Sequence, residues 1–262
     1  MNILDKIIVH KKEEVNVRKG LVTEAELMAS KYFSRHCLSL KAKLMDSSST
    51  GIIAEFKRKS PSKGFINQYA DVEVITKAYT AQGAAGLSVL TDNEFFGGST
   101  HDLILAREND IPILRKDFMI DAYQIMAAKA MGADVVLLIA ACLTRAEVKF
   151  LSAYAKELKL EVILELHDES ELDHICESIE MVGINNRNLK TFAVDVNRSL
   201  KMAKQIPGGI VKIAESGISD VATIERFKDA GFQGFLIGEI FMKEADPAKA
   251  FETFVNRLQN EH

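Results

Sequence analysis

The stretch DVVLLIAACLTRAEVKFLSAYAKELKLEVILEL, residues 134–166, contains one complete strand–helix–strand unit. Its two ends, DVVLLIA (134–140) and EVILEL (161–166), are short apolar runs of the kind found in parallel strands that are covered on both faces. Between them, LTRAEVKFLSAYAKEL (143–158) repeats apolar residues with the period of an amphipathic helix. Two strands joined by a helix in this way predict a βα unit of a parallel sheet.

The same unit recurs along the whole chain. Further strand-like runs are GIIAEF (51–56), GLSVLTD (86–92), IPILRKD (111–117), MVGIN (181–185), IVKIAES (210–216) and FQGFLIG (232–238), which makes eight with the two above. Each is followed by a helix-like stretch, and Gly83, Gly132 and Gly231 lie where such helices should end. Eight βα units close into a barrel more naturally than they form an open sheet. We therefore predict an α/β fold, a (β/α)8 TIM barrel, with an open doubly wound sheet as the alternative.

Residues 1–48 lie outside this repeat. Segments 3–18 and 23–45 look helical, and SSSTG (47–51) resembles a linker into the first strand. Ile7, Leu27 and Leu40 need burial, so a disordered tail is the less favoured alternative. We expect an N-terminal helical extension (1–48) packed on a barrel catalytic domain (49–262).

Composition and charge exclude several classes of protein. The chain of 262 residues has a formal net charge of -4, which does not point to nucleic acid as a partner. Its three cysteines are widely spaced and form no C-x-x-C pair, so neither disulfides nor zinc are expected. Asp5 interrupts the first apolar run, which argues against a signal peptide, and no stretch is long and apolar enough for a membrane helix. We expect a cytoplasmic protein with no membrane partner and no metal.

Active sites of such barrels lie at the carboxyl ends of the strands. Charged and polar residues at those ends include Glu55, Lys57, Ser60, Lys116, Glu165, Asn185 and Arg187, and the seventh strand ends in Glu215 and Ser216. A lysine after a strand is usually solvated, and Asn185 and Arg187 could simply cap the next helix. Glu165 is harder to explain structurally, because an unpaired carboxylate inside the apolar run VILEL would be costly. The histidines His36, His101 and His167 are interpreted as ordinary structural or surface residues.

The last two strands end in small residues, in AESGI (214–218) and IGEIFM (237–242). Glycines there let the backbone approach a ligand, and N–H groups at the start of a short extra helix form a recurrent phosphate site in barrels. Two tight turns are the structural alternative. The pair of motifs favours a phosphorylated small molecule as the ligand.

The segment IAEFKRKSPS (53–62) resembles the first-strand signature of the indole-3-glycerol-phosphate synthase family. Further similar motifs follow in the family's order across nearly the whole chain: ILRKDF (113–118), LIA (138–140), LELHD (164–168), GINNRNL (183–189), AESGI and FLIG. The resemblance implies a lyase of tryptophan biosynthesis that needs no cofactor or metal. Such enzymes close the pyrrole ring of 1-(2-carboxyphenylamino)-1-deoxyribulose 5-phosphate, with loss of carbon dioxide and water.

The resemblance also implies roles for residues. Lys116 would be the acid that polarises the ribulose carbonyl during ring closure, while Glu165, Lys57 and Glu55 are candidates for the dehydration, in no decided order. Asn185 and Arg187 would position the substrate's hydroxyls and carboxylate. The anthranilate ring would face Phe118, together with Phe95 and Phe96. The phosphate would be held by Ser60, Ser216, Gly217, Gly238 and the backbone of Glu239.

One departure from the family concerns Glu239, where many members have serine. We expect only its backbone N–H to contact the anion, with the side chain turned away into solvent. Two other functions stay open: a phosphoribosyl-anthranilate isomerase or similar sugar-phosphate enzyme, and a barrel that only binds a phosphorylated ligand. An isomerase of this kind would need a cysteine or an aspartate at the strand ends that carry Glu55, Lys57 and Glu165 here. The sequence does not decide the oligomeric state, and a monomer is the working expectation.

Overall fold

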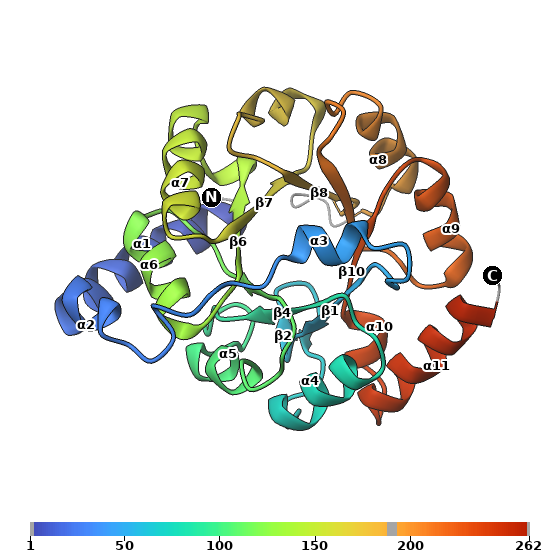
Figure 1. Ribbon diagram of the computed structural model, residues 1–262, viewed down its shortest axis with the longest axis horizontal. Helices are drawn as coiled ribbons and strands as arrows, with labels where there is room; N and C mark the ends of the chain where they lie inside the picture. The colour runs from blue at the N-terminus through green and yellow to red at the C-terminus, as the bar shows by residue number, and fades with distance from the viewer. Residues whose placement is uncertain (1–2, 188–192, 261–262) are drawn as a thin grey trace.

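A computed structural model describes residues 3–187 and 193–260 of the chain. Eight parallel strands form a closed barrel, which confirms the predicted fold and excludes the open sheet. Each barrel strand pairs with the next one along the chain, and the last pairs with the first (Figure 1). The strands are β1 (Ile52–Phe56), β4 (Gly86–Leu90), β5 (Ile113–Lys116), β6 (Val135–Ile139), β7 (Glu161–Leu166), β8 (Met181–Asn185), β9 (Val211–Glu215) and β10 (Gly234–Ile237). A small hairpin, β2 (Lys59–Ser60) with β3 (Gly64–Phe65), follows β1.

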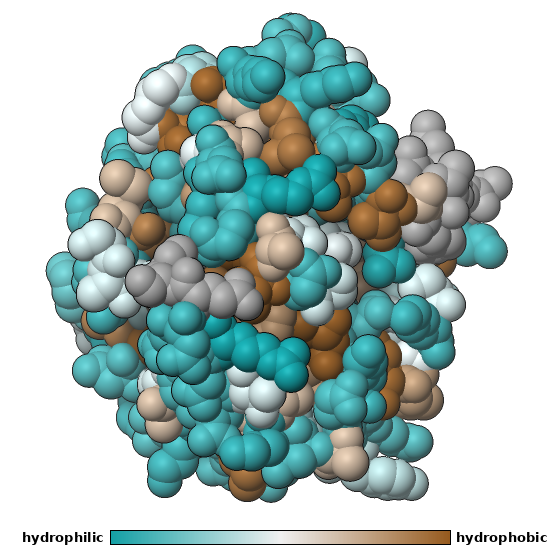
Figure 2. Space-filling view, turned by 90° about the vertical axis from the view of Figure 1, so that its right-hand side faces the viewer, coloured by the Kyte–Doolittle hydropathy of each residue, from teal (hydrophilic) through white to brown (hydrophobic). Residues whose placement is uncertain are grey.

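Helices surround the barrel, as the repeat predicts. They are α4 (Val72–Ala81), α5 (Thr100–Ala106), α6 (Ala122–Met131), α7 (Arg145–Glu157), α8 (Val196–Ala203), α9 (Val221–Asp229) and α11 (Pro247–Asn260), with the short α10 (Glu239–Met242). Most begin at an Asp, Ser or Thr whose side chain accepts a backbone N–H of the first turn, as Thr144 does for α7. The side that carries α8, α9 and α11 is mainly hydrophilic (Figure 2), because these helices turn their apolar faces to the strands.

One expected helix is missing among the described residues. After β7 the chain forms only the 3-10 turn η2 (Glu169–His174), capped by Asp168, where the repeat predicts a full helix. A second 3-10 turn, η1 (Ala140–Cys142), follows β6. The segment after β7 is rich in acidic and polar residues and has too few apolar ones to cover the barrel as a long helix would.

The N-terminal extension contacts both ends of the barrel. It contains α1 (Ile3–Leu21), α2 (Glu24–Met28) and α3 (Leu40–Met45), so the expectation of one helical segment over 23–45 is wrong. Ser39 starts α3 afresh by accepting the N–H of Ala42. Leu40 and Leu44 of α3 pack with Ile53 and Ile213 inside the barrel, and α3 lies across the centre of the ring in Figure 1. α1 reaches the opposite end, where the strands finish.

Side-chain alternation along the strands positions the site. In β7, Leu164 and Leu166 face the outer helices, whereas Ile163 belongs to the apolar cluster inside the barrel. Because successive strand residues point to opposite faces, Glu165 shares the inner face with Ile163. The same alternation turns further polar residues inward at the carboxyl ends of their strands: Glu55, Lys116, Asn185 and Glu215.

Candidate active site

A cavity of about 470 Å³ opens at the carboxyl ends of the strands, within the range of small-molecule sites. All but one of the residues expected in the site line it, the exception being Phe95: the lining includes Glu55, Lys57, Ser60, Phe96, Lys116, Phe118, Glu165, Asn185, Arg187, Ser216, Gly217, Gly238 and Glu239. Asn185 and Arg187 do not cap the next helix, because Asp195 does so for α8. Of the motif GINNRNL, residues 188 and 189 lie outside the described part of the chain.

Lys116 ends β5 at the centre of this cavity. Its Nζ lies 2.9 Å from Glu165 Oε2 and 3.4 Å from Glu215 Oε2. Burial by itself lowers the pKa of Lys116, but the carboxylates of Glu165, Glu215 and Glu55 outweigh burial and raise the pKa above its ordinary value. Lys116 is therefore a buried ammonium that stays protonated at neutral pH.

Glu165 is held by three neighbours. Lys116 contacts Oε2, Asn185 Nδ2 donates to Oε1 at 3.0 Å, and Nε2 of His167 lies 2.9 Å from the same Oε1. Burial alone would raise the pKa of Glu165, but Lys116 and His167 hold it well below its ordinary value. His167 is a buried histidine beside Glu165, whereas His36 and His101 lie on the surface.

Glu215 is a site residue that the sequence analysis did not select. It is 1% exposed, lines the cavity and has one oxygen, Oε1, without a hydrogen-bond partner among the described residues. Gly183 on the neighbouring β8 makes room for it, since a Cβ there would overlap Oε1. The signal was present in the sequence: Glu215 ends the apolar run IVKIAE, just as Glu165 lies inside VILEL.

Burial raises the pKa of Glu215 to about 7; Lys116 opposes this, while Glu165 and Glu55 add to it. A carboxyl group with a raised folded-state pKa contributes stability below its ordinary value of 4.5, and this contribution is lost as the pH rises through about 7. Between pH 5 and pH 8, the free energy of unfolding of wild type should fall by on the order of 3 kcal/mol relative to that of Glu215→Gln, which cannot ionise at this position.

Urea unfolding of both proteins at the two pH values measures this difference. Glu73→Gln, at an exposed position of α4, is the matched control and should follow wild type. An equal pH dependence for wild type and Glu215→Gln would show that Glu215 is ionised throughout.

Lys57 and Glu55 form a second pair across the cavity. Lys57 Nζ lies 2.6 Å from Glu55 Oε1, and both side chains are largely buried. The other two cations of the run KRK turn elsewhere, Arg58 to the carboxylate of Asp102 and Lys59 to a backbone carbonyl. Only the first lysine of the run therefore enters the site.

The ends of β9 and β10 form the small-residue side of the cavity. Ser216 has a φ of 65° and Gly217 one of 71°, so a non-glycine residue is held in a left-handed conformation next to the cavity. Gly238 lies against Glu55, since a Cβ there would be 2.7 Å from Glu55 Cβ. The hydroxyl of Ser60 is buried without a hydrogen-bond partner among the described residues, and Ser60 lines the cavity.

The expectation that Glu239 points into solvent is wrong. Its carboxylate lies 2.6 Å from Lys63 Nζ and 3.6 Å from Arg187 Nη2. Burial alone would raise the pKa of Glu239, but Lys63 and Arg187 lower it, so the side chain is ionised at neutral pH. Glu239 thus spans the cavity rim and neutralises two cations there.

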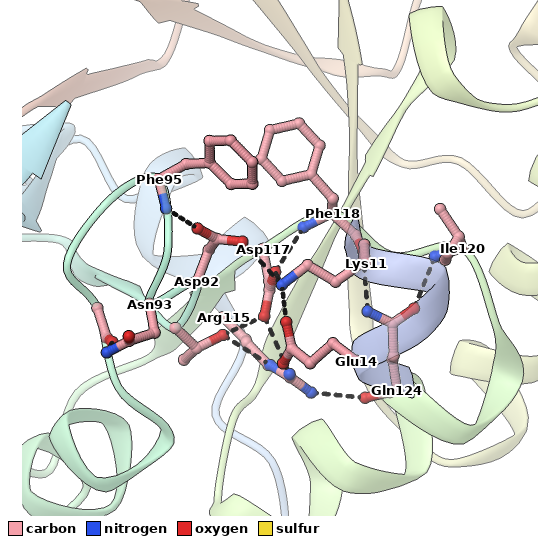
Figure 3. Close-up of polar contacts among 12 residues, drawn as sticks. Lys11, Glu14, Asp92, Asn93, Phe95, Arg115, Asp117, Phe118, Ile120 and Gln124 are labelled. Carbon is pink, nitrogen blue, oxygen red and sulfur yellow. Dashed lines mark hydrogen bonds and ion pairs between the residues drawn. The ribbon is translucent and has the colours of Figure 1, made fainter. Parts of the chain in front are cut away.

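Helix α1 is attached to the site through a buried lysine (Figure 3). Lys11 is 1% exposed and its Nζ lies 2.9 Å from Asp92, 2.9 Å from Asp117 and 2.7 Å from Glu14. Asp117 directly follows Lys116 and accepts the N–H of Phe118, while Asp92 accepts the N–H of Phe95. The network joins α1 to the ends of β4 and β5.

The cavity has an apolar wall beside Lys116. The rings of Phe96 and Phe118 lie 6.0 Å apart and both line the cavity, and α1 adds Ile3, Leu4 and Ile7. Phe95 does not line the cavity; its ring packs edge-on against His10 of α1. An aromatic ligand would fit between these surfaces.

The described residues contain no cluster of three or more His, Cys, Asp or Glu that could hold a metal ion. The cysteines Cys37, Cys142 and Cys176 are free. Within residues 3–187 and 193–260, no helix is long and apolar enough to span a membrane.

A closed (β/α)8 barrel whose mouth gathers two lysines and three buried carboxylates defines a barrel enzyme of the acid–base type. The sequence profile of the indole-3-glycerol phosphate synthase family matches residues 4–254. An indole-3-glycerol phosphate synthase from Bacteroides thetaiotaomicron is 48% identical over 259 residues, which is 98% of this chain and 99% of that protein. One from Polaromonas sp. is 44% identical, covering 95% and 96%. The chain belongs to the indole-3-glycerol phosphate synthase family.

The enzyme is therefore a carboxy-lyase of tryptophan biosynthesis that acts on a phosphorylated small molecule. Among solved structures, 3-hexulose-6-phosphate synthase from Salmonella typhimurium is similar with a TM-score of 0.62, 14% identity and coverage of 81% of this chain and 100% of that one. A mutant tryptophan synthase α-subunit from Pyrococcus furiosus is similar with a TM-score of 0.57 and 14% identity, covering 80% and 98%. At such low identity these two structures show the shared fold alone.

Proposed function

We propose that the cavity at the strand ends is where the anilino-deoxyribulose phosphate is converted to indole-3-glycerol phosphate, and that Lys116 is the acid of ring closure. The observation that carries this proposal is the position of Lys116, buried between Glu165 and Glu215 beside the aromatic wall. A protonated lysine there can donate to the ribulose carbonyl while the ring carbon attacks it. Its charge also stabilises the oxyanion that develops on that oxygen.

The spatial pairing supports a division of labour that the sequence left open. Glu165 is tied to Lys116, whereas Glu55 is tied to Lys57. We assign the dehydration to the second pair: Lys57 protonates the leaving hydroxyl, and Glu55 accepts the proton that is lost as the indole forms. In this assignment Glu165 stays a carboxylate that keeps Lys116 charged and placed.

Asn185 and Arg187 complete the proposed binding of the substrate's hydroxyls and carboxylate. Asn185 donates to Glu165 and its Oδ1 accepts the N–H of Arg187 at 3.0 Å, so the amide joins the two residues. We place the anthranilate ring between Phe96, Phe118 and the apolar residues of α1.

The phosphate is assigned to Ser60, Ser216, Gly217, Gly238 and the backbone of Glu239. Ser216→Ala removes one hydroxyl donor while leaving the backbone in place. We expect KM to rise about tenfold with little change in kcat, because a hydrogen bond to a charged group is worth about 1.5–3 kcal/mol and the phosphate is remote from the bond changes. Competitive inhibition by inorganic phosphate should weaken by the same factor.

Ser48→Ala, in the loop before β1 at the other end of the barrel, is the matched control. Gly238→Val would not test phosphate binding alone. The valine side chain would overlap Glu55, so this exchange should lower kcat as well as raise KM. An unchanged KM and an unchanged phosphate inhibition constant for Ser216→Ala would move the phosphate away from this end of the cavity.

Other expectations from the sequence belong to the same proposal. They are a boundary between extension and barrel domain at residues 48 and 49, a monomer, a cytoplasmic location, and catalysis without metal or cofactor. Sedimentation of the purified enzyme, and turnover followed by indole fluorescence with EDTA present, measure the oligomeric state and the metal requirement.

A further inference from the structure

His167 lies behind Glu165, between two carboxylates. Its side chain is 9% exposed, with Nε2 2.9 Å from Glu165 Oε1 and Nδ1 3.9 Å from Glu171 Oε2. The backbone N–H of His167 donates to the same Glu171 oxygen at 2.6 Å. Among the described residues that line the cavity, Glu165 is present and His167 is not, so any effect of the imidazole on the substrate passes through Glu165.

Local structure after β7 builds this row of three side chains. Glu165 and His167 are two residues apart at the end of a strand, so they share one face. Asp168 then caps η2 by accepting the N–H of Ser170, and this turn brings Glu171 back beside His167. A row of carboxylate, imidazole and carboxylate thus runs from η2 into the barrel mouth.

The groups that face His167 are almost all acidic. They are Glu165 on β7, Glu171 on η2 and Glu215 on β9, together with the thiol of Cys142 on η1, which lies near Glu165 and Glu171. Burial lowers the pKa of His167, but the three carboxylates outweigh burial and raise it above its ordinary value. The three carboxylates therefore favour the charged form of the imidazole, which lies on the side of Glu165 opposite Lys116.

We propose that His167 is a positioning residue for Glu165: its imidazolium, held from behind by Glu171, keeps that carboxylate ionised and directed at Lys116. This inference rests on the role of Glu165 given above. Asn185 donates a hydrogen bond to Oε1 and Lys116 one to Oε2, and His167 Nε2 lies 2.9 Å from Oε1 as an ion-pair partner, so the carboxylate has little freedom to turn. When His167 loses its proton at higher pH, its electrostatic attraction to Glu165 weakens and kcat falls.

The pH dependence of kcat and an NMR titration of the His167 ring test the proposal. His167→Gln should lower kcat about tenfold at neutral pH, as loss of a group that orients a reacting residue does, with KM changed less than threefold. The alkaline fall in kcat that belongs to His167 should disappear in this variant. In Glu171→Gln the fall should move to lower pH, because removing a carboxylate lowers the pKa of the imidazole.

His174→Gln is the matched control on the same turn, because its ring nitrogens contact the backbone carbonyls of Glu171 and Leu143. Its pH profile should match that of wild type. A pH profile that stays the same in Glu171→Gln, or a ring that titrates below the ordinary histidine value, would overturn the proposal. The NMR titration needs no turnover. If the site were assigned wrongly, the kinetic effects would be absent but the ring would still titrate as expected. If His167 were assigned wrongly, the titration itself would differ.

Discussion

Lys116→Met is expected to lower kcat by at least about 100-fold, because removing a positioned acid typically costs 10²–10⁴ in rate. Methionine keeps the length and apolar volume of the side chain and deletes the charge and the proton. Glu165 and Glu215 would then face each other without their shared cation, so the oxyanion of ring closure would develop opposite uncompensated carboxyl groups. Steady-state assays by indole fluorescence give kcat and KM directly.

Binding should survive this substitution, since the proposed phosphate contacts lie on other strands. A substrate analogue whose carbonyl is reduced, and which cannot cyclise, should bind within a few-fold of its wild-type affinity. Lys12→Met, at an exposed position of α1, is the control and should keep wild-type activity. If Lys116→Met retained more than roughly a tenth of wild-type kcat, Lys116 would not be the acid, and the same substitution at Lys57 would be the next test.

Lys11→Met should produce the largest loss of stability among the exchanges considered. Lys11 is the buried cation between Asp92 and Asp117, and burial alone would lower its pKa, but these carboxylates raise it. Breaking a buried ion pair by removing one partner costs about 3–5 kcal/mol, because the other charge is left uncompensated. We expect a decrease of this size in the free energy of unfolding by urea.

The matched control is again Lys12→Met, one residue along the same helix and exposed, which should change stability by less than about 0.5 kcal/mol. Lys11→Arg should restore part of the loss, since it keeps the charge while altering the geometry. Equal stabilities for Lys11→Met and Lys12→Met would mean that α1 is held by its apolar contacts alone.

The fold could be predicted from the chain because its signal is local and repeated. Strand β6 is apolar at every position, β7 is apolar apart from Glu161 and Glu165, and the helix between them has a clear apolar stripe, so each unit can be recognised by itself. The exceptions are also local. The helix expected over 23–45 ends at Met28 and a new one begins only after Ser39, and the stretch after β7 forms a 3-10 turn, because the apolar pattern there is too weak to specify a helix.

The site was predicted in part for a similar reason. The last residues of every barrel strand lie at the same end of the barrel. Their position at strand ends was therefore enough to predict that Lys116, Glu165 and Glu55 belong to the site. Glu215 carried the same signal as Glu165, an acid at the end of an apolar run, and was still passed over in favour of the serine and glycine that follow it. The small residues at the ends of the last two strands indicated the phosphate side, and family resemblance added the reaction.

What the sequence by itself determined is therefore the order of the strands and the set of side chains that face the mouth, because periodicity and strand direction are properties of the chain. Only the tertiary structure decided which of these charges meet. Pairs such as Lys116 with Glu165, Lys11 with Asp117, and Glu239 with Lys63 join residues far apart in the sequence. Folding brings the charged atoms of each pair within 3 Å of each other. For the buried residues Lys116, Glu165 and Lys11, the charge of the nearest partner then outweighs burial and decides the direction of the pKa shift.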